Sequence, residues 1–185
     1  MSFLRSSLAI LFVSTFAFVS CSKDNEKPDN QINRTDLTSK VWRTYSYEIK
    51  LDDKAYTVLI DSPKNKATNY PILYQDWTFS ENGTVTAKDE EGDEETSTWS
   101  LANNKLSIDY SIEDTELKVE APISIEGNLL KYKLADNVDL NKKEDSFTAS
   151  ESLAALYLLQ ATLRDQLPVS QNTKRMSLTI IYKAK

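Results

Sequence analysis

Histidine is absent from this chain of 185 residues, and cysteine, glycine and proline occur one, three and five times. Without histidine the chain lacks the commonest general base and the commonest metal ligand. The glycines Gly83, Gly92 and Gly127 stand far apart, which excludes a phosphate-cradling loop. Ser-His and Cys-His nucleophile pairs are excluded as well. We therefore expect a protein that is not an enzyme and that holds no cofactor and no structural metal.

A basic surface is missing too. The chain has 22 Lys and Arg against 28 Asp and Glu, a net charge of −6, which argues against nucleic acid as a partner. Residues 89–95 form the most acidic stretch and could hold Ca²⁺ loosely through carboxylate oxygens. Their spacing is not that of an EF-hand, and a solvated hairpin loop is the better interpretation. Length and the lack of internal repeats fit one domain with an appendage.

The N-terminal apolar run covers residues 8–19 and is interrupted by Ser14 and Thr15. It is too short and too polar for a spanning helix but suits a signal peptide over residues 1–20. It ends in Phe18-Val19-Ser20-Cys21, which resembles the lipobox of bacterial lipoproteins. The resemblance implies that Cys21 is acylated with palmitate-type chains and becomes the mature N-terminus. The alternative is an ordinary signal followed by a free or buried cysteine.

The charged stretch 22–26 resembles the Lys/acidic export signal that follows the lipidated cysteine in surface lipoproteins of Bacteroidetes. This resemblance implies anchoring in the outer membrane through the lipid, with the protein facing outward at the cell surface. The alternative is a charged tether without an export role. Residues 21–36 are polar and contain Pro28, so we expect a flexible tether before a folded domain over residues 37–185.

Alternating apolar and polar residues predict strands with a period of two over most of the domain. These strands cover residues 41–51, 55–60, two hairpins within 76–110, and then 117–125 and 130–134. Asn82-Gly83 predicts a type I′ turn, and Asn103-Asn104 predicts the next turn. In the first strand the expected inward residues are Val41, Tyr45, Tyr47, Ile49 and Leu51, with Trp42 as the exception.

The period then changes to that of a helix. Thr148 and Glu151 have the spacing of a capping box, which predicts a helix over about residues 149–166 that ends before Pro168. Its expected apolar stripe consists of Leu153, Leu156, Tyr157, Leu163 and Leu167. Alternation over residues 176–183 predicts a final strand.

Eight meandering strands, a helix and a last strand resemble the lipocalin-like domains of bacterial lipoproteins. The matching residues are the Leu37…Trp42 opening, the hairpin over residues 77–84, and residues 98–106. The resemblance implies a mainly β fold, an up-and-down antiparallel barrel of about eight strands. It also implies a late basic residue over Trp42, for which Arg164 and Arg175 are candidates. An immunoglobulin-like sandwich fits less well, because the turns join neighbouring strands.

Inward aromatic residues are the remaining functional candidates, since a barrel of eight strands can be filled by its side chains or hold one small ligand. Gln75 shares the phase of Trp77, and buried tyrosines need hydroxyl partners. The candidate ligand-binding residues are Tyr47, Gln75, Trp77, Trp99, Tyr110 and Tyr132. We expect a module that binds a small apolar or amphipathic molecule; the alternatives are ordinary core packing and an accessory subunit of a cell-surface complex with a filled core.

The entrance to such a barrel follows from the turns if the strands run up and down in order. The turns 52–54, 82–83, 103–104 and 126–128 are then expected at the end away from Trp42. The longer connections 61–70, 89–95 and 112–115 are expected beside Trp42. The longer loops favour a mouth beside Trp42, because such loops more often carry function. The first-strand tryptophan of lipocalins packs the base of the barrel, which favours a mouth at the opposite end. We expect the mouth at the end away from Trp42.

Overall fold

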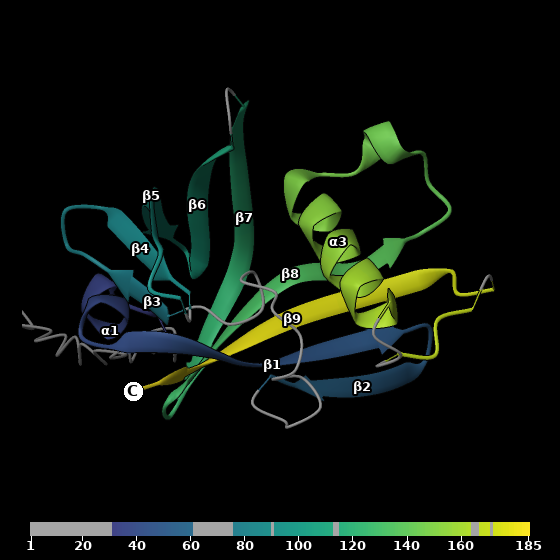
Figure 1. The fold of residues 1–185 in the computed structure, drawn as a ribbon, viewed down its shortest axis with the longest axis horizontal. Helices are drawn as coiled ribbons and strands as arrows, with labels where there is room; N and C mark the ends of the chain where they lie inside the picture. The colour runs from purple at the N-terminus through teal and green to yellow at the C-terminus, as the bar shows by residue number, and fades with distance from the viewer. Residues whose placement is uncertain (1–30, 61–75, 90, 113–114, 164–166, 171) are drawn as a thin grey trace, which may run out of the picture.

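The computed structural model describes residues 31–60, 76–89, 91–112, 115–163, 167–170 and 172–185, apart from the side chains of residues 110–112, 115, 144, 160 and 163. A short helix opens this part of the chain, nine strands follow, and one longer helix precedes the last strand (Figure 1). The elements are α1 (Arg34–Thr38), β1 (Val41–Leu51), β2 (Lys54–Leu59), β3 (Asp76–Phe79), β4 (Thr84–Lys88), β5 (Glu94–Ala102), β6 (Lys105–Ile112), β7 (Thr115–Glu126), β8 (Leu129–Asp139), the 3₁₀ turn η2 (Glu144–Ser146), α3 (Ala149–Leu163) and β9 (Arg175–Ala184).

The strands form a closed antiparallel barrel, as the sequence predicted. The order is β2-β1-β3-β4-β5-β6-β7-β8-β9, and β9 also pairs with β1. The ring therefore consists of β1 and the seven strands from β3 to β9, and β2 is an additional strand. Its core contains buried residues from every one of the nine strands and from both helices.

A β-bulge in β1 changes which residues face the interior. Thr44 pairs with Tyr182 and Ser46 pairs with Ile181, so Tyr45 is an extra residue without a counterpart on β9. One extra residue reverses the inward phase. Trp42 and Thr44 are consequently buried before the bulge, and Tyr47, Ile49 and Leu51 are buried after it. The expectation that Val41 and Tyr45 face inward is wrong: Val41 is partly exposed and Tyr45 is 37% exposed.

The β2 and β3 strands lie end to end along the same edge of β1. Residues 54–59 of β2 pair with residues 46–51 of β1, and residues 76–78 of β3 pair with residues 41–43. Both strands are antiparallel to β1 and therefore run in the same direction. The chain thus does not reverse between them, which contradicts a simple up-and-down order at this point.

This arrangement moves the short turns to the opposite end from the one expected. The turns around Gly83, Asn103-Asn104 and Gly127 lie at the Trp42 end, which we call the base; Trp77 pairs with Trp42, and the amide of Ala184 donates to the carbonyl of Asn128. The β1–β2 turn at residues 52–53 and the β4–β5 and β6–β7 connections lie at the far end. Residues 61–75 lie outside the described residues.

The turn residues explain two of these hairpins. Asn103 and Asn104 both have positive φ, at 52° and 57°, as a two-residue type I′ turn requires. At Gly83 the expected type I′ turn is replaced by a three-residue loop, because the amide of Ser80 donates to the carbonyl of Thr84. Gly83 takes the left-handed conformation, with φ at 88°.

The folded domain begins before the expected boundary at Leu37. α1 starts at Arg34, and the backbone amide of Ile32 donates to Asn104 Oδ1 at the base, at 2.8 Å. Leu37 is fully buried, and its carbonyl accepts from Trp42 Nε1 at 3.0 Å. The part of the expected tether from residue 31 onward is therefore attached to the barrel, and residues 1–30 lie outside the described residues.

α3 begins with the expected capping box. Thr148 Oγ1 accepts from the amide of Glu151 at 3.3 Å, and Glu151 Oε2 accepts from the amide of Thr148 at 2.7 Å. The buried face of the helix is rotated from the expected stripe, with Ala154, Leu158 and Ala161 buried. Leu156 and Leu159 are 43% and 54% exposed, so the placement of Leu156 in the stripe is wrong.

Candidate functional site

The sequence-predicted binding residues separate into two groups inside the barrel. Trp77 and Trp99 belong to the base, whereas Tyr47 and Tyr132 lie nearer the middle, opposite α3. All four side chains are at most 6% exposed. Gln75 and the side chain of Tyr110 lie outside the described residues.

Aromatic side chains pack closely in the base. The Trp77 ring lies 5.2 Å from the Tyr182 ring and 5.9 Å from the Phe79 ring. Phe79 in turn meets Trp99 edge-on, with ring centroids 5.1 Å apart. Trp99 Nε1 donates to the carbonyl of Ser80 at 3.1 Å, so its polar edge is also satisfied within the fold. These contacts make Trp77 and Trp99 part of the packed floor of the barrel.

Two cations from the N-terminal part of the domain cover this floor. The Arg34 guanidinium of α1 lies 4.3 Å from the centre of the Trp99 ring, and Lys40 Nζ lies 5.2 Å from that of Trp42. The cation over Trp42 therefore comes from early in the chain. Arg175 does not fill this role, because it begins β9 at the far end and pairs with Asp139. Arg164 lies outside the described residues.

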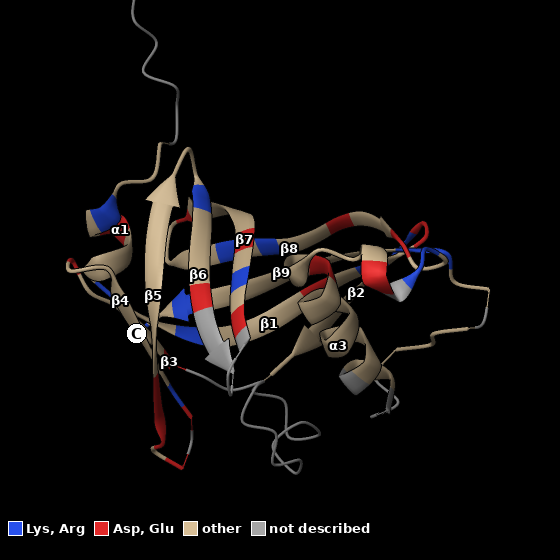
Figure 2. Ribbon diagram, turned by 90° about the horizontal axis from the view of Figure 1, so that it is seen from above, with Lys and Arg blue, Asp and Glu red and all other residues tan. Residues whose placement is uncertain are grey.

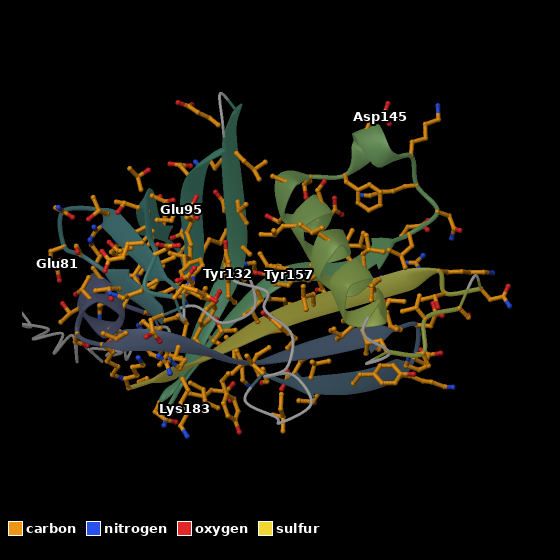
Figure 3. The ribbon with its side chains drawn as sticks, viewed as in Figure 1. Glu81, Glu95, Tyr132, Asp145, Tyr157 and Lys183 are labelled. Carbon is orange, nitrogen blue, oxygen red and sulfur yellow. The ribbon has the colours of Figure 1, made fainter. Side chains whose placement is uncertain are left out.

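The second group is a cluster of three tyrosines, Tyr47, Tyr132 and Tyr157, which we call the tyrosine cluster. Tyr157 of α3 lies 5.1 Å from Tyr47 of β1, measured between ring centroids. Tyr132 Oη donates to the carbonyl of Val119 at 3.3 Å. Figure 3 shows Tyr132 of β8 and Tyr157 of α3 next to each other at the side of the helix. The cluster joins residues of three elements that are distant in sequence.

Burial in the tyrosine cluster raises the pKa of two of its hydroxyl groups. Burial raises the pKa of Tyr132, and the neighbouring Tyr157 and Glu120 raise it further. Burial also raises the pKa of Tyr157. Both hydroxyls are neutral at physiological pH, as tyrosines ordinarily are, and that of Tyr132 already donates to Val119 and keeps only its acceptor positions. Sequence reasoning put Tyr157 on the buried stripe but not in the site, since only the packing of α3 brings it to Tyr47.

An ion-pair network closes the barrel wall near the base, where β1 and β3 share three residue pairs. Arg43 Nε and Nη2 donate to the two oxygens of Asp76 at 2.6 and 2.7 Å. Lys185 Nζ donates to the same carboxylate. Burial acts to raise the pKa of Asp76, but the hydrogen bonds from Arg43 and Lys185 and their charges outweigh it and lower that pKa.

Surface cavities lie at both ends of the described barrel. One of about 310 Å³ lies at the base between the N-terminal segment and β7, lined by Ile32, Asp36, Asn104 and Ile123 among others. Another of about 270 Å³ lies at the far end beside Asp52, Asn137 and Arg175. The rims of both are formed largely by polar and charged side chains.

Two carboxylates of the acidic stretch 89–95 make contacts within the β4–β5 hairpin. Asp89 Oδ1 accepts from the amides of Gly92 and Asp93, both at 2.8 Å, and Lys88 pairs with Glu94 at 2.9 Å. Figure 2 shows the ribbon coloured red for Asp and Glu residues at the tip of the β4–β5 hairpin. Within the part of the chain that the structure describes, no group of three or more Cys, Asp or Glu is arranged to hold a metal ion.

The described strands form a closed antiparallel β-barrel that contains two aromatic clusters, and α3 packs against β7 and β8. None of the known family models, curated proteins or solved structures that were compared matches this chain. Among the described helices, none is both long and apolar enough to cross a membrane.

Proposed function

We propose that this protein is an outer-membrane lipoprotein, anchored through Cys21, whose lipocalin-like barrel binds a small apolar or amphipathic molecule without chemistry. The observation that carries the binding proposal is the tyrosine cluster. It places the hydroxyl groups of Tyr132 and Tyr157 in apolar surroundings near the middle of the interior, beyond the packed base. Ligand sites are typically apolar with a few oriented polar groups.

The packing of the base supports a ligand site in the part of the interior away from the base. Trp42, Trp77 and Trp99 fill the interior there, and α1 covers it from outside. The hairpin connections at the far end include one of five residues, between β4 and β5, and two of two residues, so loop length does not decide between the ends. The position of Trp42 favours the far end for the mouth. The described chain enters the fold at the base, which orients the mouth away from an anchor at Cys21.

Labelling with a radioactive fatty acid tests the anchor. The wild-type protein should carry the label, and Cys21→Ala should lose it, because the proposed acylated residue is gone. Retained label in Cys21→Ala would exclude this anchor. Digestion of intact cells with external protease tests whether the domain faces outward.

Ligand binding is tested by native mass spectrometry of the purified protein together with a lipid extract of it. We expect a bound apolar molecule in the wild type and at least tenfold less in Tyr47→Ala, which removes one wall of the tyrosine cluster. Tyr45→Ala is the matched control, because Tyr45 lies on the same strand but faces outward. Equal loss in both variants, or no bound molecule in the wild type, would contradict the proposal.

A second function is favoured by Leu156 and Leu159, which are exposed on the outer face of α3. Two large apolar side chains on one helix face suit a protein partner, as in an accessory subunit of a surface complex. Leu156→Glu with Leu159→Glu should then abolish co-purification of a partner and leave the fold intact. Unchanged co-purification with this variant would exclude α3 as the contact.

A further inference from the structure

The barrel wall is divided between β7 and β8. β7 pairs with β6 along residues 115–122, and its pairing with β8 in the described strands is confined to residues 123–126. β8 pairs with β9 on its other side from Leu129 to Asp139, so beyond Tyr132 β9 is its only strand partner among the described pairings. The two strands consequently diverge from the base toward the far end, and α3 lies in the angle between them (Figure 1).

α3 replaces the missing strand contact at one edge of this gap. Ser150 Oγ accepts from the amide of Glu120 at 3.2 Å and donates to the carbonyl of Glu120 at 2.9 Å. In a continuous sheet such backbone groups would pair with the neighbouring strand. From the same helix, Tyr157 reaches across the interior and packs against Tyr47 of β1, which lies beyond β8 and β9 in the ring. The helix therefore bridges the two parts of the wall over the tyrosine cluster.

The hold of α3 on the barrel is weaker than that of a strand. Two of its buried residues, Ala154 and Ala161, have the smallest apolar side chains, whereas the large Leu156 and Leu159 point outward. Buried apolar area determines most of the stability of a packed helix, and on α3 it comes chiefly from Leu158 and the partly buried Leu153 and Tyr157, with little from the two alanines. The polar contacts at its N-terminus, Ser150 with Glu120 and Lys142 with Glu151, then matter more.

We propose that the mouth at the far end extends sideways along the gap between β7 and β8, and that α3 is the lid of this entrance. The ligand reaches the tyrosine cluster when the helix detaches from the β7 edge, and the contacts of Ser150 set how often this occurs. The inference deepens the proposed function, because it assigns the route and the control of entry to the same apolar site. The inference depends on the proposed function only for the chemical class of the molecule that enters.

Hydrogen exchange tests the lid without a ligand. All described elements lie within residues 31–185, so the polypeptide 22–185, which lacks the acylated cysteine, retains them. We expect the amides of α3 to exchange faster than those of the β8–β9 ladder, and Ser150→Ala to speed exchange in α3 about tenfold, since it removes two hydrogen bonds. Ser152→Ala is the matched control, because Ser152 is exposed on the same helix.

Stopped-flow uptake of the apolar dye N-phenyl-1-naphthylamine tests the entrance. Ser150→Ala should raise the association and dissociation rates by the same factor and leave Kd within twofold, because Ser150 contacts β7 and not the tyrosine cluster, and the closed helix with Tyr157 in place remains the main form with and without dye. If the amide hydrogens of α3 exchange at the same rate as those of the whole barrel, α3 does not open by itself and the lid proposal is excluded. Faster α3 exchange with unchanged dye rates would overturn the entrance. A dye that binds nowhere would refute the proposed site, and the exchange result would still decide whether α3 opens by itself.

Discussion

The network around Asp76 should be the largest electrostatic contribution to stability in the described barrel. β1 and β3 close the wall through three residue pairs, and the Arg43–Asp76 pair is one of them. Arg43 holds the carboxylate with two hydrogen bonds, and the Asp76 side chain is 16% exposed. Lys185 adds a third donor from the end of the chain that follows β9.

Asp76→Asn keeps the shape of the side chain and removes its charge. Hydrogen bonds to charged groups contribute about 1.5–3 kcal/mol each, and the amide retains part of this. Arg43 is left partly buried without its counter-charge, which adds to the loss. Arg43 is one-third exposed, so solvent screens the pair and the lower part of the range applies. We expect the free energy of unfolding to fall by about 2 kcal/mol.

The pH dependence has a definite sign. The pKa of Asp76 is below its ordinary value of 3.8 in the folded protein, so the unfolded chain takes up a proton first as the pH falls. The contribution of Asp76 is therefore complete above about pH 5 and is lost as the pH falls below 4 through the lowered pKa. The difference between wild type and Asp76→Asn should shrink over this interval.

Urea unfolding followed by tryptophan fluorescence measures the effect, because Trp42 and Trp77 lie in the same seam. Glu94→Gln is the matched control: it removes the Lys88–Glu94 pair, in which both side chains are at least half exposed, and should change the free energy of unfolding far less than Asp76→Asn does. A loss for Asp76→Asn no larger than that of the control, or a difference that does not change between pH 7 and pH 3, would refute the reasoning.

Three further predictions concern local structure. Thr148→Ala removes the helix cap and should lower the free energy of unfolding by about 1 kcal/mol, measured by circular dichroism. Hydrogen bonds from Lys142 and from the Thr148 amide lower the pKa of Glu151, so the stabilisation by Glu151 should be lost as the pH falls below about 4.5. Gly83→Ala should cost about 1 kcal/mol in urea unfolding because φ is 88°, and Gly83→Asn should cost less; equal costs would argue against backbone strain. Trp42→Phe should cost about 2 kcal/mol in thermal unfolding, since it empties buried space and leaves the Leu37 carbonyl without its donor; a change below 0.5 kcal/mol would exclude a structural role for that hydrogen bond.

Local patterns predicted much of the fold. The capping box at Thr148, the turn at Asn103-Asn104 and the alternation in β7 and β9 depend on neighbours in sequence, and the structure has them where the sequence places them. The strand phases also identified Tyr47, Trp77, Trp99 and Tyr132 as interior residues.

Long-range pairing accounts for what the sequence did not predict. The bulge at Tyr45 appears only when β9 is aligned with β1, and it alone explains why Trp42 and Tyr47 share a face. The end-to-end placement of β2 and β3 is decided by their common partner, and it reversed the expected ends of the barrel. The rotation of α3 depends on Ser150 meeting β7, for which no signal exists within the helix itself.

The pairing of β9 with β1 also dictates when this protein can fold. Trp42 pairs with Ala184, which follows it by 142 positions, so the ring cannot close until β9 has been synthesised. Until then β1 and β8 each present an unpaired edge, which can join strands of other molecules. Contacts of such separation also fold slowly. A truncation that removes β9 should therefore yield an aggregation-prone open sheet, whereas loss of the residues before Gln31 should leave closure unaffected.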